Sequence, residues 1–212
     1  MDPEALERAV RALAGGLVVA TPTDTVYGLA VDPRNPEAVV RLFALKERPR
    51  EVALPVLVAS RDQVGVVAAP LDGAADRLAD RFWPGSLTLV VPRAVGFTAD
   101  LGGPPSVRET VGVRWPDHPV VHQLCTALGP LAVTSANIHG SLPASTADEV
   151  ARMFPGAGGV AVVLDGGPCD GLPSTVVECR DGETRPLRHG AIAWNEIEDP
   201  VATTIRVPGH RP

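Results

Sequence analysis

Hydroxyl and amide side chains gather at two places in the sequence, each directly after an apolar run. Residues 21–30 read TPTDTVYGLA, and residues 133–140 read VTSANIHG. Small donors and acceptors at the carboxyl end of a strand commonly line a ligand pocket in an α/β sheet. Ser135 and Asn137 would then face sugar, base or phosphate oxygens, although a turn that caps the loop accounts for the same residue types. The first stretch predicts a polar pocket in the same way.

Four cationic side chains accompany these polar stretches. Lys46 and Arg48 end an expected helix in LKERPR, Arg114 interrupts the apolar strand GVRWP, and Arg188 follows a proline in PLRHG. A strand-embedded arginine nearly always meets an anion or a carboxylate. Arg48 could act as a bidentate fork and Lys46 as a point charge, but a solvated basic helix end fits equally well. For any single arginine an internal salt bridge is the simpler interpretation; together the four indicate an anion-binding pocket.

The absence of several well-known motifs argues against the chemistries that those motifs carry. The sequence lacks GxxxxGK[ST], GxGxxG after a strand, GxSxG and HExxH. His118 and His122 have helical metal-ligand spacing but no recognisable third ligand, so no metal site is expected. The cysteines at 125, 169 and 179 are odd in number and lack CxxC spacing, which predicts a reducing cytoplasm.

Composition limits the class of protein further. The formal charge of −6 argues against a broad basic face for nucleic acid, and only 4% of residues are aromatic. No apolar run of about 18 residues predicts a transmembrane helix. The acidic, amphipathic start MDPEALERAV is unlike a secretory signal. We therefore expect a cytoplasmic protein with no membrane partner.

Alternating helix and strand patterns predict one α/β domain over residues 1–194, with a twisted, mostly mixed sheet flanked by helices. Helices are expected at 3–14, 36–46, 61–68, 72–82, 118–129 and 146–154. Strands are expected at 17–20, 53–59, 86–92, 110–116, 130–137, 160–165, 174–178 and 191–194. Residues 195–212 lack a pattern and are interpreted as a C-terminal tail.

Seven motifs resemble one known family over about residues 8–193. They are PTDTVYGL, KERP, FWPGSLTLV, TVGVRWPDHP, TSANIHG, STVV and LRHGAI. In this order they resemble the YrdC-like threonylcarbamoyl-adenylate synthases. That family converts L-threonine, bicarbonate and ATP into threonylcarbamoyl-AMP and pyrophosphate, from which partner proteins modify adenosine 37 of tRNAs. The resemblance implies the short, single-domain form and a large central cavity. From the acidic composition we expect little direct tRNA binding.

The resemblance also implies roles for nine residues. The expected contacts to L-threonine are Thr25, Arg114 and Ser174. The expected contacts to ATP are Arg48, Thr110, Ser135, Asn137 and Arg188. Lys46 and Arg48 are the expected catalytic residues, with Lys46 and Arg188 beside the polyphosphate. Mg²⁺ is expected to arrive with the nucleotide.

Three positions depart from the family pattern and keep alternatives open. Val52, Leu57 and Pro143 stand where the family often has asparagine, histidine and serine, so the amine substrate could differ. One alternative is a module that forms carbamoyl-adenylate from carbamoyl phosphate. The other is a nucleotide- or RNA-binding module without catalysis.

Overall fold

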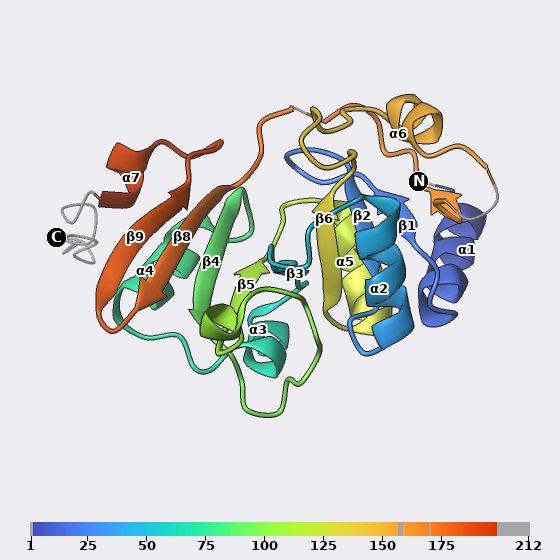
Figure 1. Cartoon of the computed structure of the whole chain (residues 1–212). Coiled ribbons are helices and arrows are strands. Elements are labelled where there is room, and N and C mark those ends of the chain that lie inside the picture. Colours follow the sequence, from blue (N-terminus) through green and yellow to red (C-terminus); the bar gives the residue numbers. More distant parts are fainter. Residues whose placement is uncertain (1, 157–158, 170, 199–212) are drawn as a thin grey trace, which may run out of the picture.

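One nine-stranded mixed sheet forms the centre of the molecule, as the computed structural model shows for residues 2–156, 159–169 and 171–198 (Figure 1). The strands lie in the order β7-β1-β2-β6-β3-β5-β4-β8-β9. Their bounds are β1 Val19–Thr21, β2 Gly28–Val31, β3 Val56–Leu57, β4 Leu87–Pro92, β5 Thr110–Arg114, β6 Leu131–Ser135, β7 Val162–Val163, β8 Thr175–Arg180 and β9 Glu183–Arg188. Three neighbouring pairs are parallel, β1 with β7, β3 with β5 and β4 with β8, and the others are antiparallel. The mixed sheet expected from the sequence is confirmed.

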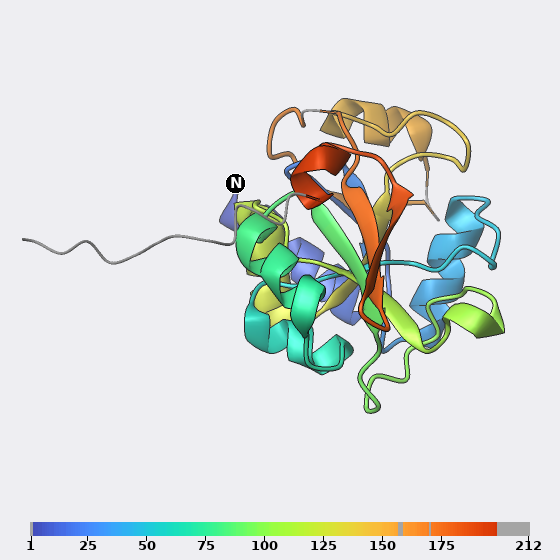
Figure 2. The same ribbon diagram turned by 90° about the vertical axis from the view of Figure 1, so that its left-hand side faces the viewer.

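Helices flank the sheet. They are α1 Pro3–Ala14, α2 Pro36–Leu45, α3 Arg61–Val67, α4 Gly73–Phe82, α5 Pro119–Leu128, α6 Ala147–Met153 and α7 Trp194–Glu198, with a 3-10 turn at Pro105–Val107. In Figure 2, α3, α4 and α5 gather on one side of the sheet and α2 lies on the other.

Helix starts follow from local chemistry. Asp2 accepts a hydrogen bond from Glu4 N, and Asn35 accepts from two backbone N–H groups at the start of α2. In α1, α2 and α5 a proline occupies the first helical turn, where its missing N–H costs nothing. These caps explain why the starts of the helices could be predicted from the sequence.

Apolar side chains pack in two buried clusters. The larger joins α2, α3 and α4 to strands at both ends of the sheet, with Tyr27, Leu42 and Leu89 among its buried members. The smaller packs α1 against α5 and includes Leu13, Leu124 and Leu57. Apolar side chains of the central strands, such as Val56 and Val113, also belong to these clusters, so apolar packing supports the sheet along its whole width.

Some expected elements were wrong or shorter. Residues 191–194 do not form a strand, and the expected strand 53–59 is reduced to β3. Strand β2 was missed because its four residues are all buried, and β9 because its six residues are all exposed, so neither shows an alternation of apolar and polar side chains. Residues 195–198, expected to begin the tail, belong to α7, whose Ile197 is buried in the larger cluster; residues 199–212 lie outside the described part. No described helix is both long and apolar enough to cross a membrane.

Candidate active site

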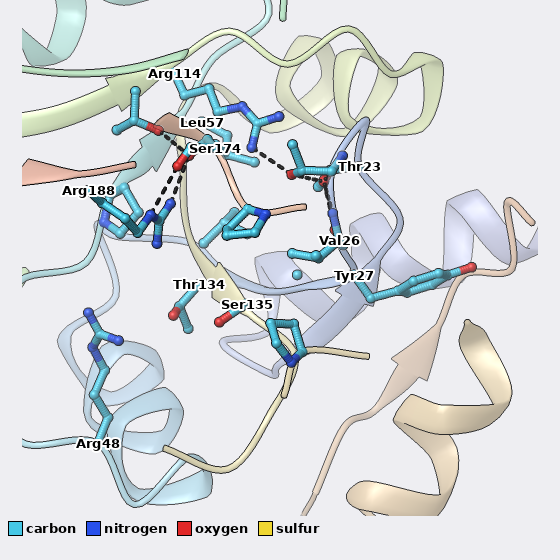
Figure 3. Close-up of a pocket in the computed structure, with 17 residues that line it drawn as sticks. Thr23, Val26, Tyr27, Arg48, Leu57, Arg114, Thr134, Ser135, Ser174 and Arg188 are labelled. Atoms are coloured by element: carbon cyan, nitrogen blue, oxygen red, sulfur yellow. Dashed lines mark hydrogen bonds between the residues drawn. The ribbon is translucent and has the colours of Figure 1, made fainter. Parts of the chain in front are cut away.

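A pocket of about 250 Å³ lies across the middle of the sheet (Figure 3). Strands β2, β3, β4, β5, β6 and β9 contribute to its lining, together with the loops before β2 and β8. Of the nine residues predicted from the sequence, six line it: Thr25, Arg48, Arg114, Ser135, Ser174 and Arg188. These residues are far apart in the chain, so only the sheet brings them together.

In the hydroxyl-rich turn at residues 21–27, one threonine hydroxyl stabilises the turn and another contacts an arginine of the pocket. Thr23 Oγ1 accepts hydrogen bonds from the backbone N of Thr25 (3.1 Å) and of Val26 (3.2 Å), which is how threonine stabilises a tight turn. Thr25 Oγ1 instead accepts from Arg114 Nη1 at 2.9 Å. Tyr27 leaves the turn toward another loop, where its hydroxyl donates to Gly167 O at 2.9 Å. Thr25 is therefore the threonine of the turn that contacts the pocket arginine.

Arg114 is buried, with 6% of its surface exposed. Its Nε donates to Gly85 O (3.0 Å), its Nη1 to Thr25, and its Nη2 to Asp24 Oδ1 at 2.5 Å. Burial lowers the pKa of the guanidinium and the Asp24 carboxylate opposes that shift. Since arginine carries five N–H donors, two remain for a ligand once these three bonds are made.

Unlike Arg114, Arg48 and Arg188 have hydrogen-bond partners without charge. Arg48 donates to the carbonyls of Val52 and Ala53, and Arg188 donates to O and Oγ of Ser174, at 2.9 to 3.1 Å. Neither forms an ion pair with a carboxylate in the described ranges. Burial lowers both pKa values, with a further contribution to Arg48 from Arg188 and to Arg188 from Arg114. Two adjacent cations without acidic partners favour a polyanionic ligand.

Lys46, the only lysine of the chain, lies behind the pocket and does not line it. Its Nζ donates to the carbonyls of Ser135 and Asn137 and to Asn137 Oδ1, and 1% of its surface is exposed. Burial, followed by the charge of Arg48, lowers its pKa to about 7. Its three oxygen partners use all three N–H donors of the ammonium group, which favours the protonated form.

The side chain of Asn137, like that of Lys46, forms its hydrogen bonds within the protein. Its Oδ1 also accepts from Ser135 Oγ at 2.6 Å, and its Nδ2 donates to the carbonyls of Ile138 and Ser141. The expected phosphate and nucleotide contacts of Lys46 and Asn137 stay predictions; in this structure both residues support the loop that carries Ser135.

A second pocket of about 480 Å³ adjoins the first. The two share Arg48, Pro55, Thr88 and Arg188 in their linings. The ninth predicted residue, Thr110, lines this second pocket, and its Oγ1 donates to Val107 O at 3.0 Å. Most of the lining is apolar, as suits a flat apolar ring. Its charged members are four arginines and two glutamates, Arg48, Arg93, Arg185, Arg188, Glu51 and Glu178.

The three departures from the family pattern all lie in pocket walls. Leu57 and Pro143 line the first pocket and Val52 lines the second. Leu57 pairs with Arg114 across neighbouring strands, so an apolar side chain stands beside the buried arginine.

Two contributors to the site were missed from the sequence. Thr88 lines both pockets and its Oγ1 lies 2.8 Å from Ser174 Oγ. A lone hydroxyl in the apolar strand LTLVVP was the available signal. Asp24 holds Arg114 from within the hydroxyl-rich turn, where its charge was overlooked among so many hydroxyls.

The remaining candidates have structural positions. His118 precedes α5 and its Nδ1 accepts from Val120 N at 3.3 Å, so it caps the helix on which His122 lies. Nowhere in the described residues do three His, Cys, Asp or Glu side chains come together as metal ligands. Cys125 is buried, and burial raises the pKa of its thiol to about 12.

A mixed α/β sheet with three arginines in the lining of one pocket is an arrangement suited to anionic ligands. The family model Sua5/YciO/YrdC, described as "Telomere recombination", matches residues 11–190. The chain belongs to this family, which confirms the resemblance noted in the sequence.

Named relatives agree. A Vibrio cholerae protein named threonylcarbamoyl-AMP synthase is 41% identical over 169 residues, covering 77% of this chain and 86% of that protein. A Bacillus subtilis protein of the same name is 37% identical over 204 residues, covering 93% of this chain but 56% of that protein. The solved structure of P. abyssi Sua5 complexed with L-threonine is 36% identical with a TM-score of 0.81, covering 91% of this chain and 56% of that chain. The chain thus spans little more than half of the two longer proteins.

Proposed function

We propose that this protein is an L-threonylcarbamoyladenylate synthase, a nucleotidyltransferase that makes threonylcarbamoyl-AMP and pyrophosphate from L-threonine, bicarbonate and ATP. The observation that carries the proposal is that the arginines lining one pocket differ in their partners, which gives the pocket two ends suited to different anions. At one end Arg114 is already paired with Asp24 and offers directional N–H groups. At the other end Arg48 and Arg188 have no acidic partner among the described residues.

The first end suits an amino acid. A carboxylate, or the carbamate formed on the amine, would accept the two remaining N–H groups of Arg114, next to the hydroxyls of Thr25 and Ser174. Threonine supplies a hydroxyl that these neighbours can match. The name of the P. abyssi complex and the names of the relatives support threonine as this amino acid.

The second end suits the nucleotide. Arg48 and Arg188 would hold the phosphates, and the larger apolar pocket beyond them would hold the adenosine, with Thr110 in its wall. Ser135 lines the same pocket, and Lys46 acts through Ser135 by fixing its loop. Mg²⁺, carried by the nucleotide, would neutralise part of the phosphate charge.

The chemistry this arrangement supports is positioning and charge stabilisation. The carbamate oxygen has to be held in line with the α-phosphorus of ATP while pyrophosphate leaves. Arg48 and Arg188 stabilise the charge that accumulates on the departing pyrophosphate, which a preorganised cation does better than water. No covalent intermediate with the protein is needed.

The product would pass to proteins that transfer the threonylcarbamoyl group to adenosine 37 of tRNA. Such a role places the protein in the cytoplasm. Direct binding of tRNA would be weak, since the chain carries a formal charge of −6.

The test is pyrophosphate release from Mg-ATP with bicarbonate, measured with and without L-threonine, and with serine or carbamoyl phosphate in its place. We expect release only when threonine and bicarbonate are both present. Release with carbamoyl phosphate alone would assign the protein to the carbamoyl-adenylate class. No release under any condition would contradict catalysis and favour a binding module.

A further inference from the structure

Asp24 forms a buried ion pair with the pocket arginine without lining the pocket itself. Its Oδ1 accepts from Arg114 Nη2 at 2.5 Å and its Oδ2 accepts from Ser86 Oγ at 3.1 Å. The two side chains are 14% and 7% exposed. Asp24 does not belong to the lining of the first pocket, so any effect on a ligand passes through Arg114.

The contacts of Arg114 fix its plane from two directions. Asp24 and Thr25 hold the two terminal nitrogens from the turn before β2, and Gly85 O accepts from Nε on the other side. Gly85 is tied in turn to Trp115 by its own N–H (2.8 Å). A planar guanidinium held at its three nitrogens has a fixed orientation, with one free N–H on Nη1 and one on Nη2.

The charges in the pocket are arranged unevenly. Arg48, Arg114 and Arg188 line one pocket of about 250 Å³, and among these three Asp24 pairs only with Arg114. The charge of Arg114 reaches Arg188, whose pKa it lowers together with burial. Asp24 therefore removes net positive charge at one end of the pocket and leaves it at the other.

We propose that Asp24 is a positioning residue that makes the Arg114 end of the pocket selective for the singly charged carboxylate of an amino acid and unattractive to phosphate. This inference rests on the proposed function. With Asp24 present, a singly charged carboxylate is accepted through directed N–H groups, while a polyphosphate finds its uncompensated charge at Arg48 and Arg188. Without Asp24, both ends attract phosphate.

The test compares Asp24→Asn with Asp32→Asn by calorimetric titration of L-threonine. Asp32 is a matched control: its side chain is 12% exposed and paired with Arg34 at 2.7 Å, outside both pockets. We expect the Kd for threonine to rise at least about tenfold in Asp24→Asn and to stay unchanged in Asp32→Asn, since loss of one partner leaves Arg114 misoriented. Added inorganic pyrophosphate should compete with threonine in Asp24→Asn only.

Two outcomes would contradict the role of Asp24. Equal threonine affinity in Asp24→Asn and the unaltered protein, or competition by pyrophosphate in both alike, would overturn the inference. Where Asp24→Asn fails to fold, Ser86→Ala replaces it, because it removes only the bond from Ser86 to Asp24; a smaller rise in Kd supports the inference and no rise refutes it. If the unaltered protein binds no threonine, the proposed function itself fails.

Discussion

Arg188 donates a hydrogen bond from Nη2 to the hydroxyl of Ser174 at 2.9 Å. The residue expected at the polyphosphate therefore contacts the residue expected at the amino acid. Thr88 extends this contact, because its Oγ1 lies 2.8 Å from the same hydroxyl. Ser174 therefore joins the amino-acid end of the pocket to the polyphosphate end. We expect the carbamate and the α-phosphate to come together next to this residue.

Replacing Arg188 tests the polyphosphate end. Arg188→Lys keeps the charge but loses the fork that holds Ser174, and Arg188→Ala loses both. We expect pyrophosphate release to fall by about a hundredfold or more in Arg188→Ala, and by less in Arg188→Lys. Arg180→Ala is the control, because Arg180 lies on β8 in surface ion pairs with Glu109 and Asp181. Normal turnover in Arg188→Ala would remove this residue from the reaction.

Replacing Lys46 distinguishes support of the loop that carries Ser135 from direct contact with phosphate. Lys46→Met removes three hydrogen bonds that the buried ammonium group donates, which should lower the free energy of unfolding by about 3 kcal/mol in the absence of any ligand. Urea unfolding measures this. Unchanged stability together with lost activity would instead favour a direct phosphate contact.

The burial of Lys46 allows an independent measurement. As the only lysine of the chain, it is the single side-chain target of an amine-acylating reagent. With 1% of its surface exposed, it should stay unmodified in the folded protein and react once the chain is unfolded. Mass spectrometry of the lysine-containing peptide reports the result.

Replacing Gly190 tests whether the close approach between its backbone and the backbone of Ser174 positions Ser174. A Cβ at this position would lie 2.5 Å from the backbone carbonyl carbon of Ser174, so Gly190→Ala must displace one of the two segments. We expect a loss of about 1–3 kcal/mol in stability and a higher KM for threonine.

The matched control for Gly190 is Gly65→Ala. Gly65 lies in α3, where an added Cβ meets nothing within 4 Å. This variant should gain up to about 1 kcal/mol, because alanine is the better helix former. Equal behaviour of the two variants in urea unfolding would argue against the close approach.

His118 gives the protein a pH-dependent helix cap. Burial lowers its pKa below the ordinary 6.5, against the opposing charges of Asp24 and Asp117. The unfolded chain therefore binds more protons than the folded chain just below pH 6.5. Stability should fall as pH drops from 6.5 through the folded pKa, when Nδ1 can no longer accept from Val120 N.

The matched variant His118→Asn keeps a good cap but does not titrate. We expect the drop in stability below pH 6.5 to shrink in His118→Asn and to persist in His122→Asn, since His122 is exposed on the same helix. Urea unfolding at pH 5 to 7.5 measures both. An unchanged pH profile in His118→Asn would assign the dependence to other groups.

Local chemistry alone determined much of this protein. Asp2, Asn35 and Thr146 marked helix starts because their side chains cap backbone N–H groups two or three residues away. The order of motifs identified the family and six of the residues that line the pocket. Such features depend on neighbours in the chain or on residue types, and both are visible in the sequence.

Tertiary structure decided what each polar residue contacts. Arg114 and Asp24 are 90 positions apart, and Lys46 and Asn137 are 91 apart. No periodicity reports such a pairing, because it depends on how β2, β5 and β6 are ordered in the sheet. Lys46 was expected at the phosphate and lies behind the pocket because a buried ammonium group takes whichever oxygens surround it, and the fold supplies three.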